Sequence, residues 1–425
     1  MIMGERIVYK SDFSFTPTGD FSNGRLQVDA IRLLDFKAFY DSGWIELNRI
    51  TMLLGKNSIG KSSITQAIQM IKLCYDKLQQ GQKSPGLIAL EDEFGTFDEL
   101  KNNASENRSF TVILRLKSDN SEYSYSIIVD GSGLESRINI RLFDKDELVY
   151  ETGSTDEVVN VFFVSFSETD YKDTNTDLFV AAVNGVKEFA SKLEYMEPIR
   201  YTPHRRYSVS GTMASSVGVR GDNTYDMLFY LSQIEHDVPS AVKEWLSMFG
   251  YELVWKPEEK RRNEGAFWLR NIKTNIMTNI IDNGFGILQS LPIVLAMAMK
   301  KEGLLVIDTP EAHLQSPIES SFADIIESTM KDGLSIMLET GSEQILLRLR
   351  KLIAEQRISP EDVSCYFIDE SEDDRSIKAI QLTISEDGMM EADNTSFYNF
   401  FSGSVLDLME IKKIQYERIK GRQNE

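Results

Sequence analysis

The order of apolar and polar stretches along the chain predicts an α/β protein. Short continuous apolar runs, typical of strands buried on both faces, lie at residues 50–54, 304–307, 334–339 and 363–368. Apolar residues at helical spacing follow, at residues 63–72, 286–301, 316–331 and 343–355. Such alternation of strand and helix favours a mixed or parallel sheet with helices packed against it.

A different pattern occupies residues 109–167. β-prone segments at 110–116, 123–129, 138–142 and 158–166 are separated in several places by turn residues, which indicates an antiparallel meander beside the main sheet. Two further strands are expected before the first apolar run, at residues 26–36 and 44–47. Helical spacing also occurs at 175–194 and 223–249, and the chain should end in a hairpin from Ile377 and a helix from about Val405.

The first apolar run leads into a glycine-rich loop that carries chemistry. Residues 55–63 read GKNSIGKSS and fit G-x-x-x-x-G-K-[ST], the phosphate-binding P-loop. Between a strand and a helix, backbone N–H groups and the helix N-terminus can surround a phosphate. Lys61 would reach the β- and γ-phosphates of ATP and the Ser62 hydroxyl would bind Mg²⁺. The predicted nucleotide contacts in this loop are Asn57, Ser58, Ile59, Gly60, Lys61, Ser62 and Ser63.

A P-loop needs an acid at the end of a neighbouring strand to hold the Mg²⁺ shell, and Asp308 ends the run at 304–307. Residues 308–317, DTPEAHLQSP, resemble the Walker B segment of OLD-like and RecF/SMC-like ABC-type ATPases. Weaker segments agree with the family in order. They are Phe36–Phe39, the arginine-bearing loops at 198–207 and 217–222, a degenerate signature at 282–292, the strand end at 339–343, and a C-terminal extension that includes 397–401.

The resemblance covers most of residues 28–410 and implies an ABC-type head that binds ATP and Mg²⁺. Two copies, or a higher homo-oligomer, would assemble through ATP, with Gly284 and Gly286 of one copy approaching the ATP of the other. Glycine suits that role because the backbone must come close to a ligand. OLD nucleases carry a TOPRIM nuclease domain after the ATPase, but we expect none here, because the residues after Walker B are taken up by the ATPase sheet and the extension.

Three positions depart from the family pattern. In the D-E version of Walker B, the residue after the metal-binding acid polarises the attacking water, but here it is Thr309, which cannot act as a base. Leu288 replaces a serine of the signature, and Gly341 replaces a histidine near the γ-phosphate. The catalytic assignment therefore falls to Asp308 and Glu311, although Pro310 leaves the direction of Glu311 open. Losing such groups costs about 10² to 10³ each in rate, so we expect tight ATP binding with turnover below about 1 s⁻¹.

Charge and composition bear on partners. The net charge of −20 argues against a broad grip on nucleic acid, which needs many cations against phosphates. The basic segments 256–262 and 412–422 are interpreted as solvated faces, with a local basic patch as the alternative. Cys74 and Cys365 have no cysteine neighbour, and no stretch approaches the roughly 18 apolar residues of a membrane span, so we expect a cytoplasmic protein.

Two other clusters have a structural and a chemical interpretation. The acidic run 369–374 could be a metal-dependent nuclease centre, but a solvated hairpin turn is favoured because it lies between two strands. His313, beside Walker B, is expected to cap or pack rather than catalyse. The arginine loops could contact phosphates, contact a second subunit or simply carry surface charge, and these interpretations are weighted evenly.

These features predict four regions: 1–170 with the P-loop and β-rich lobe, 171–300 with a helical signature lobe, 301–370 with Walker B, and 371–425 as an extension. The function expected from the resemblance is an ATP-held switch that controls a protein effector, as in bacterial anti-phage systems. The alternatives are a RecF/SMC-like DNA-repair or chromosome-maintenance ATPase that binds DNA in the dimer, and a scaffold in which ATP is purely structural.

Overall fold

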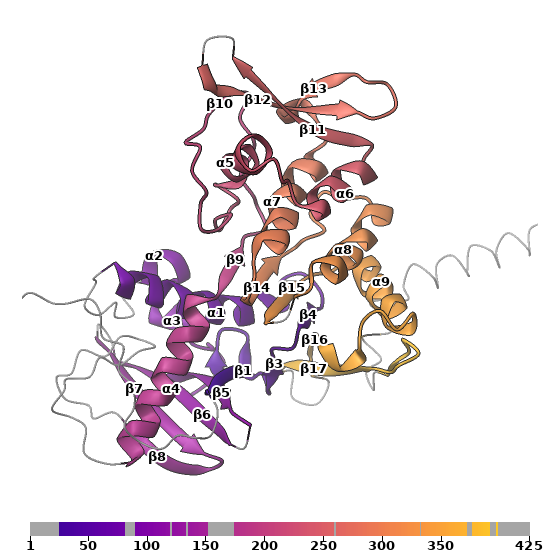
Figure 1. Cartoon of the computed structure of the whole chain (residues 1–425). Coiled ribbons are helices and arrows are strands. Elements are labelled where there is room, and N and C mark those ends of the chain that lie inside the picture. The colour runs from indigo at the N-terminus through magenta and orange to yellow at the C-terminus, as the bar shows by residue number, and fades with distance from the viewer. Residues whose placement is uncertain are drawn as a thin grey trace, which may run out of the picture.

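The computed structural model describes residues 25–80, 90–119, 121–132, 135–151, 174–258, 261–331, 333–371 and 376–391, together with Phe397. Figure 1 shows three parts: a central sheet with helices beside it, a β-rich lobe below, and a lobe with its own small sheet above. None of the described helices is long and apolar enough to cross a lipid bilayer.

The central sheet has the strand order β18-β17-β16-β4-β15-β14-β9. From β16 to β9 neighbouring strands run parallel, whereas β17 and β18 are antiparallel additions at one edge. Every residue of β4 is buried, as its continuous apolar run predicts. The strands are β4 (Ile50–Leu54), β9 (Glu194–Met196), β14 (Gly303–Asp308), β15 (Leu334–Glu339), β16 (Val363–Glu370), β17 (Ile377–Ile384) and β18 (Met390–Glu391).

Helices cover both faces of this sheet. One hydrophobic cluster joins α1 (Lys61–Gln79) to alternate residues of the strands, such as Val306 and Met337. The other cluster joins α7 (Phe285–Met299), α8 (Ser316–Thr329) and α9 (Glu343–Ala354) to the residues between them, such as Ile307 and Leu338. Side chains change face at every residue of a strand. Asp308 and Glu339, two residues after Val306 and Met337, therefore lie on the same face of the sheet as α1.

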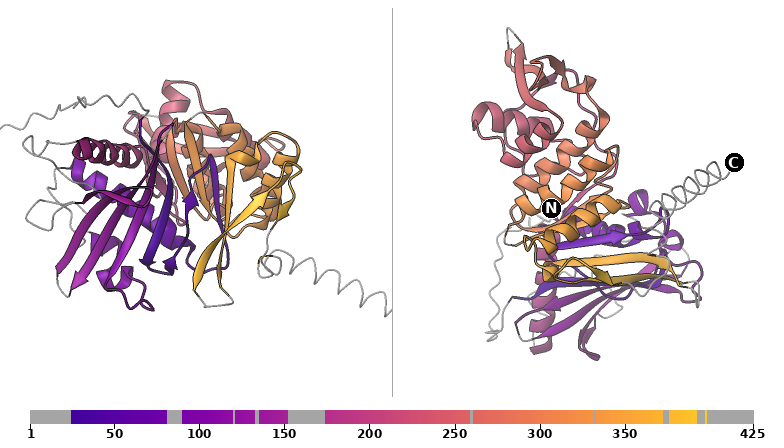
Figure 2. Two further views of the ribbon diagram at one scale, coloured as in Figure 1. Left: turned by 90° about the horizontal axis from the view of Figure 1, so that it is seen from below. Right: turned by 90° about the vertical axis from the view of Figure 1, so that its right-hand side faces the viewer.

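The β-rich lobe is an antiparallel sheet of order β2-β1-β5-β6-β7-β8, with β3 also paired to β1. It shares the α1-side core, and α4 (Thr174–Ser191) packs against it (Figure 2). The helices α2 (Glu91–Phe94) and α3 (Phe97–Leu100) are single turns. The strands are β1 (Gln27–Phe36), β2 (Phe39–Asp41), β3 (Ile45–Glu46), β5 (Ser109–Lys117), β6 (Glu122–Ser132), β7 (Glu135–Asp144) and β8 (Glu147–Glu151).

The upper lobe combines helices with a small antiparallel sheet of order β10-β12-β11, to which β13 pairs. Trp245 of α6 is fully buried, and its indole N–H donates to the Ser290 hydroxyl of α7 at 2.7 Å, which ties the lobe to the signature helix. The remaining elements are α5 (Thr224–Phe229), a π-helical turn (Tyr230–Ile234), α6 (Ser240–Met248), β10 (Tyr207–Ser208), β11 (Tyr251–Glu258), β12 (Arg261–Asn271) and β13 (Met277–Asn279).

The α/β fold class is confirmed: a mixed sheet flanked by helices, an antiparallel β-rich lobe and a lobe that carries the signature helix. Some details differ from the sequence predictions. The helical spacing at 223–249 is broken into α5, the π-helical turn and α6, and the strands β2, β8 and β9 to β13 were not predicted. The strand expected at 158–166, the helix from about Val405 and the basic segment 412–422 lie outside the described residues.

Candidate functional site

The P-loop leaves the carboxyl end of β4 and turns directly into α1. Gly55 and Gly60 have φ values of +145° and +121°, and Ser58 has a φ of +63°, so this turn depends on conformations that most side chains disfavour. A Cβ atom on Gly60 would lie 2.5 Å from the Ala38 Cβ, and one on Gly55 would lie 2.6 Å from the Ile368 carbonyl oxygen. The loop backbone is therefore fixed tightly between β16 and the segment after β1.

Lys61, the first residue of α1, folds its side chain back over this loop. Its ammonium group donates to the carbonyl oxygens of Gly55 at 2.8 Å and Lys56 at 2.9 Å. Burial lowers the pKa of Lys61, and nearby carboxylates oppose that effect, Glu339 most strongly, then Glu311 and Asp308. The predicted phosphate-binding cation is thus brought next to both acids predicted from Walker B and to one further acid.

Three adjacent strands end at this edge of the sheet, in the order β4-β15-β14. Asp308 ends β14 and Glu339 ends β15, and the two residues are direct partners in the parallel register. Both are buried, with 9 % and 5 % of their surfaces exposed. Ligands of open α/β sheets bind outside the carboxyl ends of the strands, so the structure brings the P-loop and Asp308 together where such a ligand would lie.

Glu339 joins the sheet to the P-loop helix by two hydrogen bonds, and it was not among the predicted site residues. Its Oε1 accepts a hydrogen bond from the Ser62 hydroxyl at 2.5 Å, and its Oε2 accepts one from Thr65 at 2.8 Å. Burial and the neighbouring Asp308 raise the pKa of Glu339. The sequence signal was available, because Glu339 ends an apolar strand just as Asp308 does.

The Walker B turn follows Asp308 and has an unusual backbone. Thr309 has a φ of +46°, which is rare for a β-branched residue, and its hydroxyl donates to Asp308 Oδ1 at 2.6 Å. Tyr195 of β9 donates to the other Asp308 oxygen at 3.4 Å. Thr309 therefore orients the predicted metal ligand.

Glu311 lies in the same turn, and its direction is now defined. Its Oε1 accepts a hydrogen bond from the Gly341 amide at 2.8 Å, and its Oε2 is buried with no hydrogen-bond partner among the described residues. Burial is the main cause that raises the pKa of Glu311. Gly341, where the family has a histidine, thus presents a backbone N–H to the acid that was proposed as the base.

Arg200, from the first arginine loop, lies inside the site rather than on its surface. Its side chain is almost fully buried, and its guanidinium donates to the carbonyl oxygens of Asp308 and Thr309. Burial lowers the pKa of Arg200 to about 10. Arg200 is therefore a buried residue that supports the backbone carrying Asp308, rather than a phosphate ligand or a surface charge.

The same residue connects Walker B to the signature helix α7. The Gln289 side chain accepts a hydrogen bond from the Arg200 amide at 2.8 Å and donates to its carbonyl oxygen at 3.0 Å. The other predicted loop arginines pair with exposed acids, Arg205 with Asp282, Arg206 with Glu258 and Arg220 with Glu197. The arginines of these loops therefore have different roles. Arg200 is buried and supports the backbone, whereas the others form exposed ion pairs.

Gly284 and Gly286 lie at the start of α7. Gly284 is the N-cap, and a Cβ atom there would meet no atom within 4 Å. A Cβ atom on Gly286 would lie 2.8 Å from the His313 carbonyl oxygen, so this glycine allows α7 to approach the turn after Walker B within its own chain. Leu288 is buried in the core of the upper lobe, and the His313 ring packs edge-to-face on Phe285 with centroids 4.6 Å apart.

The donor set fits ATP with Mg²⁺. Lys61 can hold phosphate oxygens, and Ser62 with Asp308 offers the hydroxyl and carboxylate oxygens that Mg²⁺ takes beside substrate phosphates. Within the described ranges, no group of three or more His, Cys, Asp or Glu residues is arranged to hold a metal ion alone. Asp369 and Glu370, the described acids of the run 369–374, belong to the β16–β17 hairpin.

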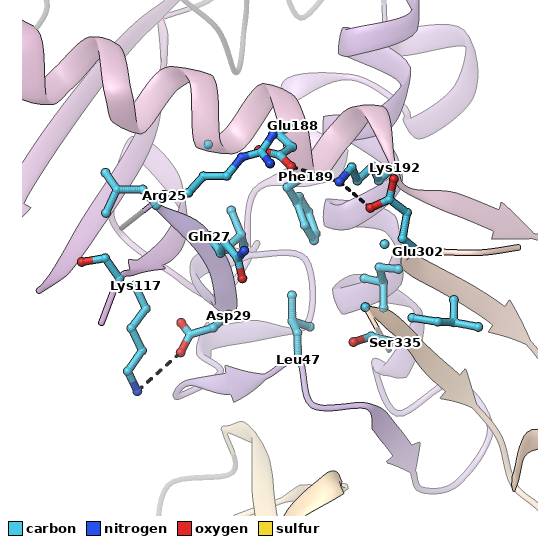
Figure 3. A pocket seen from close by; sticks show the side chains of 18 of the residues that line it. Arg25, Gln27, Asp29, Leu47, Lys117, Glu188, Phe189, Lys192, Glu302 and Ser335 are labelled. Carbon is cyan, nitrogen blue, oxygen red and sulfur yellow. Dashed lines mark hydrogen bonds and ion pairs between the residues drawn. The ribbon is translucent and has the colours of Figure 1, made fainter. Parts of the chain in front are cut away.

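A cavity of about 780 Å³ opens at the opposite edge of the sheet, beside the amino ends of β14 and β15 (Figure 3). Several of its charged residues pair with one another: Lys192 bridges Glu188 and Glu302 at 3.0 and 2.7 Å, and Lys117 lies 3.9 Å from Asp29. The nucleotide site is at the other end of these strands. This cavity is therefore separate from it, and its balanced charges favour no particular ligand.

No family model and no curated protein sequence matches the chain. Among solved structures it is similar to an Smc head bound to the C-terminal winged-helix domain of ScpA, with 12 % identity, a TM-score of 0.47, and coverage of 85 % of this chain and 98 % of that one. The SMC head domain from Thermotoga maritima gives 12 % identity, a TM-score of 0.41, and 84 % and 99 % coverage.

A third similar structure is an Smc head domain with an extended coiled coil bound to the C-terminal domain of ScpA, derived from Pyrococcus furiosus. It gives 10 % identity, a TM-score of 0.45, and 84 % and 96 % coverage. At TM-scores below 0.5 these likenesses carry no conclusion about the activity or partners of this chain.

Proposed function

We propose that the chain is an ABC-type ATPase that binds ATP with Mg²⁺, hydrolyses it slowly, and dimerises while ATP is bound. One observation carries this proposal: the P-loop with Lys61 and Ser62, and the acids Asp308 and Glu339, meet at the carboxyl ends of three adjacent strands. A chance glycine turn would not bring a buried lysine and paired carboxylates to the same strand ends.

Slow turnover is supported by how the acids of the site are held. Thr309 occupies the position of the usual water-polarising acid, and its hydroxyl is engaged with Asp308. Glu311 is the remaining candidate base, and one of its oxygens is already bound to the Gly341 amide. A general base must come within about 2.6–3.2 Å of the atom whose proton it takes, and the hydrogen bond from the Gly341 amide restricts how the Glu311 carboxylate can turn toward a water.

Assembly through ATP is supported by the surface around α7. The large apolar side chains of Ile199, Val219 and Phe285 are 67 %, 47 % and 45 % exposed. The loops of Ile199 and Val219 are joined by backbone hydrogen bonds from Glu197 to Val219 and from Tyr201 to Arg220, at 2.9 and 2.6 Å. We propose that this surface and Gly284 face the nucleotide of a second copy.

The role of such a dimer would be that of a nucleotide-held switch or scaffold for a protein effector in anti-phage defence. The resemblance of the Walker segments is the support for the defence role. The net charge of −20 favours a basic protein over nucleic acid as the partner. Salt-dependent DNA binding by the ATP-bound protein would instead favour a DNA-repair or chromosome-maintenance ATPase.

Two variants test the proposed cycle. Lys61→Ala removes the phosphate-binding cation and should abolish both ATP binding and dimerisation. Glu311→Gln keeps an acceptor for the Gly341 amide but removes the candidate base, so it should bind ATP and accumulate the dimer.

Turnover of the wild type is measured as phosphate release under saturating MgATP. A rate above about 1 s⁻¹, the ordinary range of enzymes, would refute slow hydrolysis. If Glu311→Gln assembles and disassembles like the wild type while Lys61→Ala does not assemble, ATP is a structural ligand and hydrolysis does not reset the dimer.

A further inference from the structure

We propose that Glu339 is a second carboxylate of the Mg²⁺ site, acting beside Asp308 and Ser62 on the cation or on its bound water. This inference rests on the proposed ATP-binding function and adds a residue that the P-loop and Walker B patterns do not identify. Its basis is the position of Glu339 among the strands, its hydrogen bonds and the charge balance of the site.

The strand register places two carboxylates side by side. Asp308 and Glu339 are partners across β14 and β15, and neighbouring strands lie about 4.8 Å apart. Both residues follow the side of the sheet that packs on α1, because Val306 and Met337, two positions earlier, belong to the α1-side core. The two acids therefore point to the same side, toward the start of the P-loop helix.

The hydrogen bonds of Glu339 join it to the predicted metal ligand of the loop. Ser62, the P-loop hydroxyl that would bind Mg²⁺, donates to Glu339 Oε1 at 2.5 Å, and Thr65, one turn later in α1, donates to Oε2 at 2.8 Å. These two bonds fix the carboxylate plane. An oxygen that already lies within hydrogen-bond distance of the Ser62 hydroxyl also lies within reach of a cation, or a cation-bound water, held by that hydroxyl.

The site has more negative than positive charge, which favours a bound cation. The single positive charge of Lys61 interacts with three carboxylates, those of Glu339, Glu311 and Asp308. The guanidinium of Arg200 also interacts with Asp308 and Glu311, while its hydrogen bonds go to backbone carbonyl oxygens. Adding the phosphates of ATP increases the negative charge, and like charges at short range in a buried site repel strongly. A divalent cation between the phosphates and the Asp308–Glu339 pair removes this repulsion.

The test compares ATP affinity with and without Mg²⁺, using a fluorescent ATP analogue, in the wild type and in Glu339→Gln. Glutamine keeps an oxygen that accepts from Ser62 but has no charge. Removing a residue that supports a metal lowers metal affinity by about 10- to 100-fold. The factor by which Mg²⁺ raises ATP affinity should therefore fall at least about 10-fold, while affinity in EDTA stays equal or rises because a repelling charge is gone.

A second readout follows the metal itself. Mn²⁺ bound to the protein–ATP complex, measured by electron paramagnetic resonance, should dissociate about 10- to 100-fold more readily from Glu339→Gln than from the wild type. Two controls are matched to it. Thr65→Val removes one hydrogen bond of Glu339 but leaves its charge, and Glu370→Gln neutralises an exposed acid at the end of β16. Both should keep the wild-type effect of Mg²⁺.

Three results would overturn the inference. An unchanged Mg²⁺ effect in Glu339→Gln, with normal ATP binding by the wild type, refutes the metal role alone. A loss in Thr65→Val as large as in Glu339→Gln shows that Glu339 acts only by positioning α1. If the wild type binds no ATP with or without Mg²⁺, the proposed function fails together with this inference.

Discussion

The substitution Gly286→Ala tests why the signature helix begins with glycines. The new Cβ atom would lie 2.8 Å from the His313 carbonyl oxygen and 3.0 Å from Leu314 Cδ2. The carbonyl cannot move freely, because hydrogen bonds from Ala312 to Thr309 and from Leu314 to Glu311, at 3.2 and 3.0 Å, close the turn that carries it. Relief of the clash therefore displaces α7 or the turn that holds Glu311.

The expected cost follows from these contacts. Overpacking of this kind costs about 1–3 kcal/mol, and the better helix propensity of alanine recovers up to about 1 kcal/mol. Because the atom met at 2.8 Å is a backbone oxygen that cannot rotate away, the upper end of the overpacking cost applies, and we expect Gly286→Ala to lower the free energy of unfolding by about 2 kcal/mol. Urea denaturation followed by circular dichroism measures this quantity.

Gly284→Asn is the matched control. Gly284 is the N-cap of α7 with φ −59° and ψ 137°, and its surroundings are open within 4 Å. Asparagine is a preferred N-cap residue, so stability should stay within a few tenths of a kcal/mol of the wild type or rise. The added side chain should still block the approach to a partner's ATP and prevent dimerisation. A Gly286→Ala protein as stable as the wild type would refute the close approach of α7, and ATP-dependent assembly by Gly284→Asn would refute the role of Gly284 between subunits.

Three further outcomes follow from buried groups. Arg200→Met should destabilise the fold by about 1–3 kcal/mol, because it removes the guanidinium that donates to the Asp308 carbonyl oxygen in a buried hydrogen bond; urea denaturation checks this, and no change would contradict it. Because the pKa of Glu311 is raised in the folded chain, its contribution to stability is present below the unfolded pKa and is lost as the pH rises through the folded pKa. Thermal unfolding should therefore show that Glu311→Gln stabilises the protein more at pH 8 than at pH 5, whereas an equal effect would contradict the sign. Burial raises the pKa of Cys365 to about 12 and that of Cys74 as well, so a thiol reagent at pH 8 should label neither in the native protein and both in urea.

The P-loop was predictable because its information is local. A strand, a glycine turn and a helix start within a single short stretch define the backbone of the site, and Gly55, Gly60 and Lys61 lie as that motif requires. The role of Glu339 was not assigned, because the order β4-β15-β14 that places it against Ser62 joins segments far apart in the sequence.

The burial of Arg200 depends on tertiary contacts that its loop sequence does not contain. Its loop was recognised as unusual, but no periodicity tells which arginine of a loop is buried. Whether an arginine side chain is buried against the Walker B carbonyl oxygens depends on how the loop packs between β14 and α7. Gln289 of α7 holds the backbone of Arg200 there. The contact that distinguishes Arg200 from the exposed Arg205 is tertiary.

The small sheet of the upper lobe was missed for a related reason. In β12, Phe267 and Leu269 are fully buried, Trp268 between them is half-buried and Arg270 is exposed, but Gly265 and Ala266 are buried as well. This alternation is short, and it follows a region with helical spacing. Pairing with β11 and β13 stabilises the strand, and such pairing cannot be derived from one segment alone.

The central claim is that ATP holds two copies of this chain together at the site built by Lys61, Ser62, Asp308 and Glu339. The most direct test is the mass of the protein in solution with and without MgATP. We expect one chain of 48.4 kDa without nucleotide, twice that mass with MgATP, and no change for Lys61→Ala. A wild-type protein that keeps the single-chain mass at saturating MgATP would contradict it.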